Sequence, residues 1–211
     1  MLTPSEMKSE LRILTPIGML GQGFSEQIFW EAMETGVDAI VLDSGSTDSG
    51  PGRLALGSTS VPRAGYERDL AHLVKACHIY RVSILIGSAG GDGENKHVDM
   101  LVDIISKLIS DNGYRSMNVI SIYAEISKDL VRNKLDSGLI SPCGAGVPPL
   151  LETDIESSTR VVAQMGHEPY MKAMLENPDF DIIVGGRAYD PAPYAAICLY
   201  HGFEDLGKLR L

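Results

Sequence analysis

Polar side chains suited to binding or converting a small ligand gather in short glycine-rich segments of the chain. The densest segment is DSGSTDSGP (43–51), in which two aspartates stand among four hydroxyl side chains. Carboxylates can act as acids or bases, and glycines let backbone N–H groups approach an anionic ligand closely. The same composition suits a divalent cation, a hydroxylated or acyl ligand, or an Asx-rich turn that satisfies its own backbone.

Three further segments share this character: GMLGQG (18–23), GSAGGDG (87–93) and GGRAYDP (185–191). In the last segment Arg187 follows two glycines, where a guanidinium can clamp a carboxylate or form an ion pair with Asp190 or Asp181. We predict Asp48 and Asp190 as catalytic residues. The predicted ligand-binding residues are Asp43, Ser46, Thr47, Gly50, Ser88, Gly90, Gly91, Asp92, Gly185, Gly186 and Arg187.

Known nucleotide-binding and zinc-binding motifs do not match these segments. Lys96 lies between Asn95 and His97, so the Gly-Lys-Ser/Thr sequence of a P-loop is missing. The first segment lacks the G-x-G-x-x-G spacing, although Asp43 stands about 20 residues beyond Gly23, as a ribose-binding acid would. A nucleotide or coenzyme A site is therefore kept as an alternative. The histidines form no i, i+4 pair, and the pattern identifies neither a cofactor nor a metal.

Short apolar runs alternate with helical periodicity, a pattern typical of repeated βα units. The spacing predicts strands over 11–17, 39–42, 83–86, 118–126 and 181–184. It predicts helices over 25–35, 66–80, 97–110, 128–137 and 170–176 and a last helix opened by Pro191 and Pro193, whereas 156–165 fits helix or strand. We therefore expect one α/β domain over residues 1–211, with a mainly parallel open sheet of about five or more strands flanked by helices.

Such a sheet would bring the glycine-rich segments together. Ligands of open parallel sheets bind where the loops at the carboxyl ends of neighbouring strands converge. Each glycine-rich segment follows a predicted strand, and the segment over 43–65 is long for a connection. Tyr66, Arg68 and Asp69 open the next helix, where they could close over a ligand or compensate the helix dipole.

The overall charge and the cysteine content restrict the partners. Acidic residues outnumber basic residues 28 to 18, giving a formal net charge of -10, which opposes binding to nucleic acid or to an anionic membrane. No apolar run is long enough to cross a membrane, and the first residues do not read as a signal or transit peptide. Three scattered cysteines indicate a reducing compartment, so we expect a cytoplasmic protein.

Several strings in this order resemble one known family. They are DSGSTDSGP, YERDL, IGSAGGDG, VVAQMGHEP and DIIVGGRAYDPAPYAA, which lie between about residues 12 and 202. Together they resemble the N-terminal domain of the acyclic terpene utilisation (AtuA-like, DUF1446) family. That family is named from a catabolic pathway that degrades terpenes through acyl-CoA intermediates. The resemblance implies a catabolic role but assigns no catalytic residue.

Members of the family are about twice as long as this sequence, so the resemblance implies a truncated or split form. We expect an enzyme, or the ligand-binding part of one, that acts on a small carboxylic acid or its acyl-CoA thioester. The alternative is a non-catalytic subunit that needs a partner chain to complete a site. A truncated or split form would work as a homo-oligomer or with a chain that supplies the missing half.

Overall fold

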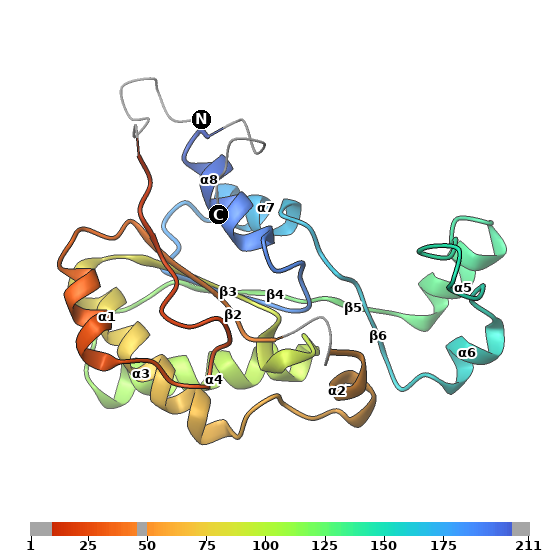
Figure 1. The fold of residues 1–211 in the computed structure, drawn as a ribbon, viewed down its shortest axis with the longest axis horizontal. Helices are drawn as coiled ribbons and strands as arrows, with labels where there is room; N and C mark the ends of the chain where they lie inside the picture. The colour runs from red at the N-terminus through yellow and green to blue at the C-terminus, as the bar shows by residue number, and fades with distance from the viewer. Residues whose placement is uncertain (1–9, 46–49, 204–211) are drawn as a thin grey trace.

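The computed structural model describes residues 10–45 and 50–203 and contains a parallel five-stranded sheet. The strand order is β1-β2-β3-β7-β4, and β5 and β6 form a separate antiparallel pair (Figure 1). The strands are β1 (Ile13–Leu14), β2 (Ala39–Asp43), β3 (Ser83–Gly87), β4 (Val119–Ile122), β5 (Glu125–Ile126), β6 (Val161–Val162) and β7 (Ile182–Gly185). The helices are α1 (Glu26–Met33), α2 (Gly50–Leu56), α3 (Arg63–Tyr80), η1 (Ala89–Gly91, 3₁₀), α4 (Asn95–Asp111), α5 (Lys128–Asp136), α6 (Glu152–Ser157), α7 (Glu168–Glu176) and α8 (Ala192–Tyr200).

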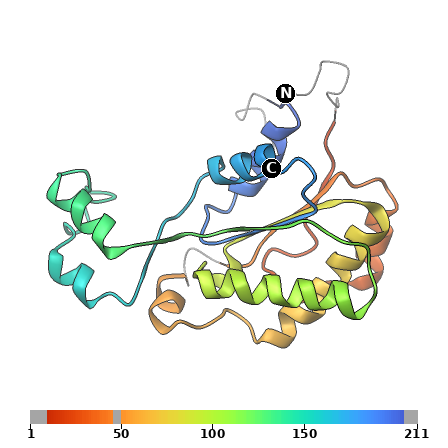
Figure 2. The same cartoon turned by 180° about the vertical axis from the view of Figure 1, so that it is seen from behind.

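The central strands are buried on both faces, which explains their continuous apolar sequences. Helices α1, α3 and α4 cover one face, and α7 and α8 cover the other, as both views show (Figures 1 and 2). The first helix begins at Ser25, whose hydroxyl accepts from the N–H of Ile28, and it ends before Gly36. The expected α/β fold with a parallel sheet is therefore confirmed.

The helices that follow β3 and β7 lie on opposite faces of the sheet, although the two strands are neighbours. From β3 the chain enters α4 on one face, whereas from β7 it enters α8 on the opposite face. Ile84 of β3 pairs directly with Ile182 of β7, so the two diverging loops start side by side. This is the topological switch point at which open α/β sheets bind their ligands.

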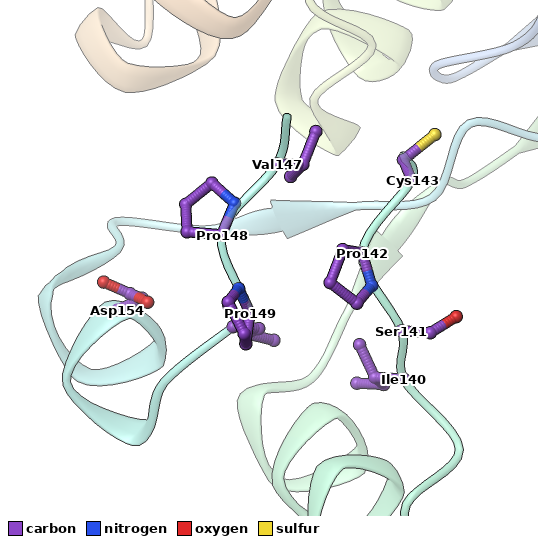
Figure 3. Close-up of a pocket in the computed structure, with 9 residues that line it drawn as sticks. Ile140, Ser141, Pro142, Cys143, Val147, Pro148, Pro149 and Asp154 are labelled. Atoms are coloured by element: carbon purple, nitrogen blue, oxygen red, sulfur yellow. The ribbon is translucent and has the colours of Figure 1, made fainter. Parts of the chain in front are cut away.

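An arm projects from the carboxyl end of β4 on the extended β5–β6 pair (Figures 1 and 2). The arm holds α5 and α6, and α5 buries none of its residues. Figure 3 shows a hollow between the segments that connect the two helices, lined by Ile140, Ser141, Pro142, Cys143, Val147, Pro148, Pro149, Leu150 and Asp154. In the described ranges, no helix is long and apolar enough to span a membrane.

The structure differs from the sequence-based prediction in three segments. The strand expected over 118–126 is divided into β4 of the main sheet and β5 of the arm. The long connection over 43–65 contains the short helix α2, and the ambiguous segment 156–165 contains the end of α6 and all of β6. Each difference depends on packing between distant segments, which local periodicity does not report.

The first glycine-rich loop is held by a carboxylate of the protein itself. The buried side chain of Asp69 accepts from the N–H groups of Gly21 at 2.7 Å and Gly23 at 3.1 Å. Arg68 donates to Asp69 at 2.8 Å and to the carbonyl of Gly21 at 2.9 Å. Asp69 therefore anchors this loop instead of closing over a ligand, and these two amides are already occupied.

We expect Asp69→Ala to lower the free energy of unfolding by about 3 kcal/mol, because it leaves two loop amides without their charged acceptor. Urea unfolding followed by circular dichroism measures the change. Asp103→Ala, at an exposed position of α4, should stay within about 0.5 kcal/mol of wild type. Equal midpoints for the two variants would show that Asp69 does not anchor the loop.

Candidate functional site

Loops from three strands meet through their backbones at the switch point. The N–H of Ser88, after β3, donates to the carbonyl of Gly186, after β7, at 3.1 Å. The N–H of Arg187 donates to the carbonyl of Gly93 at 3.3 Å. Gly93 has φ +76°, and a Cβ at this position would overlap the backbone of Arg187. A Cβ at Gly45, after β2, would likewise overlap the backbone of Gly91, so three loops form one surface.

Asp43 is a buried carboxylate at the end of β2, on this surface. It is 7% exposed, and neither of its carboxylate oxygens has a hydrogen-bond partner among the residues that the structure describes. Burial raises the pKa of Asp43 to about 6, and the nearby negative charge of Asp190 adds to the effect. The neighbouring hydroxyl of Ser88, which is engaged with the backbone of Ala188, and the guanidinium of Arg187 oppose the rise in pKa. An acid with this pKa can exchange a proton near neutral pH.

Tyr170 of α7 brings a second buried polar group to Asp43. Its side chain is fully buried, its hydroxyl has no hydrogen-bond partner in the described part of the chain, and burial raises its pKa strongly. The Tyr170 hydroxyl and Asp43 Oδ1 lie 3.8 and 3.1 Å from the point where a Cβ of Gly87 would stand. A Cβ at Gly185 would overlap the same hydroxyl, so glycine is required there for the tyrosine to enter. Tyr170 remains protonated at neutral pH and can donate a hydrogen bond to a ligand.

Arg187 supplies positive charge from the β7 side. Its side chain is buried, its Nη1 donates to the carbonyl of Gly91 at 3.3 Å, and its Nη2 lies 3.7 Å from Asp190. Asp190 is itself mostly exposed. The alternative partner, Asp181, is instead bound by Arg115 at the opposite end of β7. The guanidinium therefore lies at the switch point, close enough to Asp43 to lower its pKa.

Unsatisfied polar atoms are concentrated at this edge of the sheet. Buried polar side chains in native proteins are nearly always hydrogen-bonded, so a cluster of exceptions indicates a place that binds something. Among the described residues, every buried side-chain atom without a hydrogen bond lies in or beside these loops, except Nε of Arg115. The atoms belong to Asp43, Ser44, Ser58, Ser60, Tyr66, Asp92 and Tyr170, together with Oε2 of Glu94, which lacks a hydrogen bond but lies 3.0 Å from Lys96 Nζ in an ion pair.

The backbone at Ser88 carries strain at the same point. Its φ of 49° lies in the left-handed region, which residues with a Cβ rarely adopt. Its hydroxyl donates to the carbonyl of Ala188 at 3.3 Å and accepts from the N–H of that residue at 3.4 Å. Strained residues of this kind cluster at ligand sites, so Ser88 agrees with the position of the unsatisfied atoms.

The residues predicted as a site are partly brought together. Asp43, Ser88 and Arg187 are buried near one another, Asp92 is buried against His97 on the loop after β3, and Asp190 lies at the exposed margin. Gly50 begins α2, while Ser46, Thr47 and Asp48 lie outside the described residues. The remaining predicted residues are glycines of two of the loops: Gly90 and Gly91 follow β3, Gly185 ends β7 and Gly186 follows it.

Sequence reasoning missed Tyr170, Glu94 and His97. Tyr170 lies outside every glycine-rich segment, and only the fold brings it to Asp43. Glu94 and His97 stand in the pattern D-x-E-x-x-H with Asp92, which a search limited to histidine pairs overlooks. Recognising mixed carboxylate and imidazole spacing at a helix start would have found them.

The class that fold and site define is an α/β protein with a polar site at the switch point of a parallel sheet. No family model, curated protein or solved structure matches the chain.

The raised pKa of Asp43 makes a prediction for stability. Folding favours its protonated form, so Asp43 destabilises the fold progressively as pH rises from about 4 to 6, and fully above that range. We expect Asp43→Asn to be more stable than wild type at pH 7 by about 2 to 3 kcal/mol, with little difference at pH 4. Chemical unfolding at several pH values measures this difference.

Asp103→Asn serves as the control, since an exposed carboxylate on α4 should not change the pH profile. Parallel profiles of wild type and Asp43→Asn between pH 4 and 7 would contradict a raised pKa at Asp43.

Proposed function

We propose that this chain is the ligand-binding and acid–base part of a catabolic enzyme that acts on a small carboxylic acid or its acyl-CoA thioester. The observation that carries the proposal is the buried carboxylate of Asp43, which has no hydrogen-bond partner in the described ranges, beside the Tyr170 hydroxyl and the Arg187 guanidinium. The resemblance to the acyclic terpene utilisation family agrees with this substrate class.

The three groups suit different parts of such a ligand. The guanidinium of Arg187 attracts a carboxylate, and the tyrosine hydroxyl can donate to a carboxyl or thioester oxygen. Asp43 can take a proton from carbon or oxygen, because its raised pKa makes it a stronger base than an exposed aspartate. Asp190 would then adjust the charge of the site through its contact with Arg187.

Burial also favours chemistry at this position. Electrostatic attraction and hydrogen bonds are stronger where water is excluded, and donors fixed by the fold need not reorganise during the reaction. The loops that carry Ser88 and Arg187 are fixed by backbone hydrogen bonds across the switch point. The polar groups are therefore held in place by the sheet rather than by mobile side-chain contacts.

Calorimetric screening of small carboxylic acids and acyl-CoA thioesters tests the proposal. We expect binding by wild type and at least about a tenfold loss of affinity in Arg187→Gln, about 1.4 kcal/mol, because the cation at the switch point is removed. Arg132→Gln, which removes an arginine of the arm that is paired with Asp129 and Glu152, should bind like wild type. Unchanged affinity in a folded Arg187→Gln variant would contradict the assigned position.

A second candidate function is that of a non-catalytic subunit whose site is completed by a partner chain. The arm favours it, because Leu130, Leu139, Val147 and Leu151 are large apolar side chains left exposed there. Such side chains gathered on a projecting element are typical of interaction surfaces. On this hypothesis the arm contacts another chain, while the loops at the switch point shape part of a shared site.

Sedimentation velocity separates the two candidate functions when the second chain is a copy of this one. We expect a concentration-dependent dimer that the double change Leu139→Ser and Leu151→Ser converts to a monomer, because apolar area is lost from the interface. Leu175→Ser, at an exposed position of α7, is the matched control and should leave the dimer intact. A wild-type monomer at all concentrations that binds acids by itself would contradict the subunit function.

A further inference from the structure

Three side chains at the start of α4 form a compact group that the proposed acid–base function does not use. Asp92 directly follows η1, Glu94 precedes the first residue of α4, and His97 lies in the first turn of α4. All three are buried, and one ligand atom from each lies within 4.8 Å of the others. We propose that Asp92, Glu94 and His97 bind a divalent transition-metal ion.

Asp92 carries the first argument, because half of its carboxylate is unsatisfied. Its Oδ1 accepts from the N–H of Glu94 at 3.0 Å and contacts Nδ1 of His97 at 2.7 Å. Its Oδ2 has no hydrogen-bond partner within residues 10–45 and 50–203, although the side chain is completely buried. A buried carboxylate oxygen without a partner is costly, and a metal ion is one of the few groups that satisfies it.

The distribution of charge gives the second argument. Two basic side chains contact Glu94: Arg160 Nε lies 3.1 Å from Oε1, and Lys96 Nζ lies 3.0 Å from Oε2. Among the described residues, no lysine or arginine forms an ion pair with Asp92, whose Oδ1 contacts only the imidazole of His97 and the N–H of Glu94. Positive charge is therefore in short supply at Asp92, not at Glu94. A cation bound between the two carboxylates would correct that shortage.

The donor set indicates which kind of ion fits. Two carboxylates and one imidazole suit Zn²⁺, Mn²⁺, Co²⁺ or Fe²⁺, whereas Ca²⁺ and Mg²⁺ prefer oxygen ligands alone. Three protein ligands also leave positions open for water or a ligand, as in catalytic rather than structural metal sites.

The fold keeps the group in place and close to the switch point. Gly90 packs directly against the imidazole ring of His97, so the ring has little freedom to turn away. Gly93, between Asp92 and Glu94, accepts from the N–H of Arg187 at 3.3 Å. The metal-binding group and the Arg187 loop therefore share one backbone contact. The proposed metal site nevertheless depends only on Asp92, Glu94 and His97, and it does not require the proposed substrate.

Titration of the full chain with Co²⁺, after dialysis against a chelator, tests the proposal directly. We expect one equivalent to bind with visible ligand-field absorption, and Zn²⁺ to compete for the same site. Asp92→Asn and His97→Asn should each lower the affinity at least about 100-fold, since ligands contribute no less than the residues that orient them. Asp103→Asn and His72→Asn, which alter an exposed carboxylate of α4 and a histidine of α3, should bind like wild type.

Circular dichroism of each variant shows whether it is folded, and Glu94→Gln provides a third change if one of the others unfolds. The absence of Co²⁺ and Zn²⁺ binding by folded wild type at about 1 mM metal would overturn the proposal, because such sites bind far more tightly. Binding that persists unchanged in all folded ligand variants would also overturn it, since the ion would then lie elsewhere.

Discussion

The site depends on two stretches of backbone that pass each other with no side chain between them. Gly93 lies against the backbone of Arg187, and Gly186 lies against the carbonyl of Gly93. These contacts join the loop after β3 to the loop after β7, which otherwise lead to opposite faces of the sheet. Asp92, Arg187 and the strained Ser88 all take their positions from that junction, so the polar edge of the sheet follows from it.

The same edge holds polar groups that weaken the fold. Burying Asp43, Tyr170 and Asp92 costs stability, because some of their polar atoms have no hydrogen-bond partner among the described residues, and the apolar strands behind them must offset that cost. Native proteins keep such groups mainly where function requires them. By contrast, the backbone N–H groups of Gly21 and Gly23 are both hydrogen-bonded to the carboxylate of Asp69. Similar glycine-rich sequences thus form a polar surface after β3 and β7, whereas after β1 the glycine-rich loop is anchored to α3.

Much of the fold could be predicted from the sequence, because buried parallel strands and amphipathic helices leave clear periodic patterns. Residues 39–42, 83–86 and 128–137 were located nearly to their ends. The insertion of β7 between β3 and β4 could not be predicted, since it depends on which strands pair across long separations. For the same reason the sequence indicates Asp43 and Arg187 only as separate candidates. It does not indicate Tyr170, because only the packing of α7 on the sheet brings this side chain to Asp43.

The strand order also determines when the site can exist during folding. Strands β3 and β4 have no contact with each other in the sheet except through β7, the last described strand along the chain. During synthesis both therefore expose unpaired edges until residues 182–185 leave the ribosome. Arg187 directly follows β7, so the guanidinium reaches Asp43 only after this strand has joined the sheet. Assembly of the polar edge is thus a late, long-range event that local helix formation cannot accelerate.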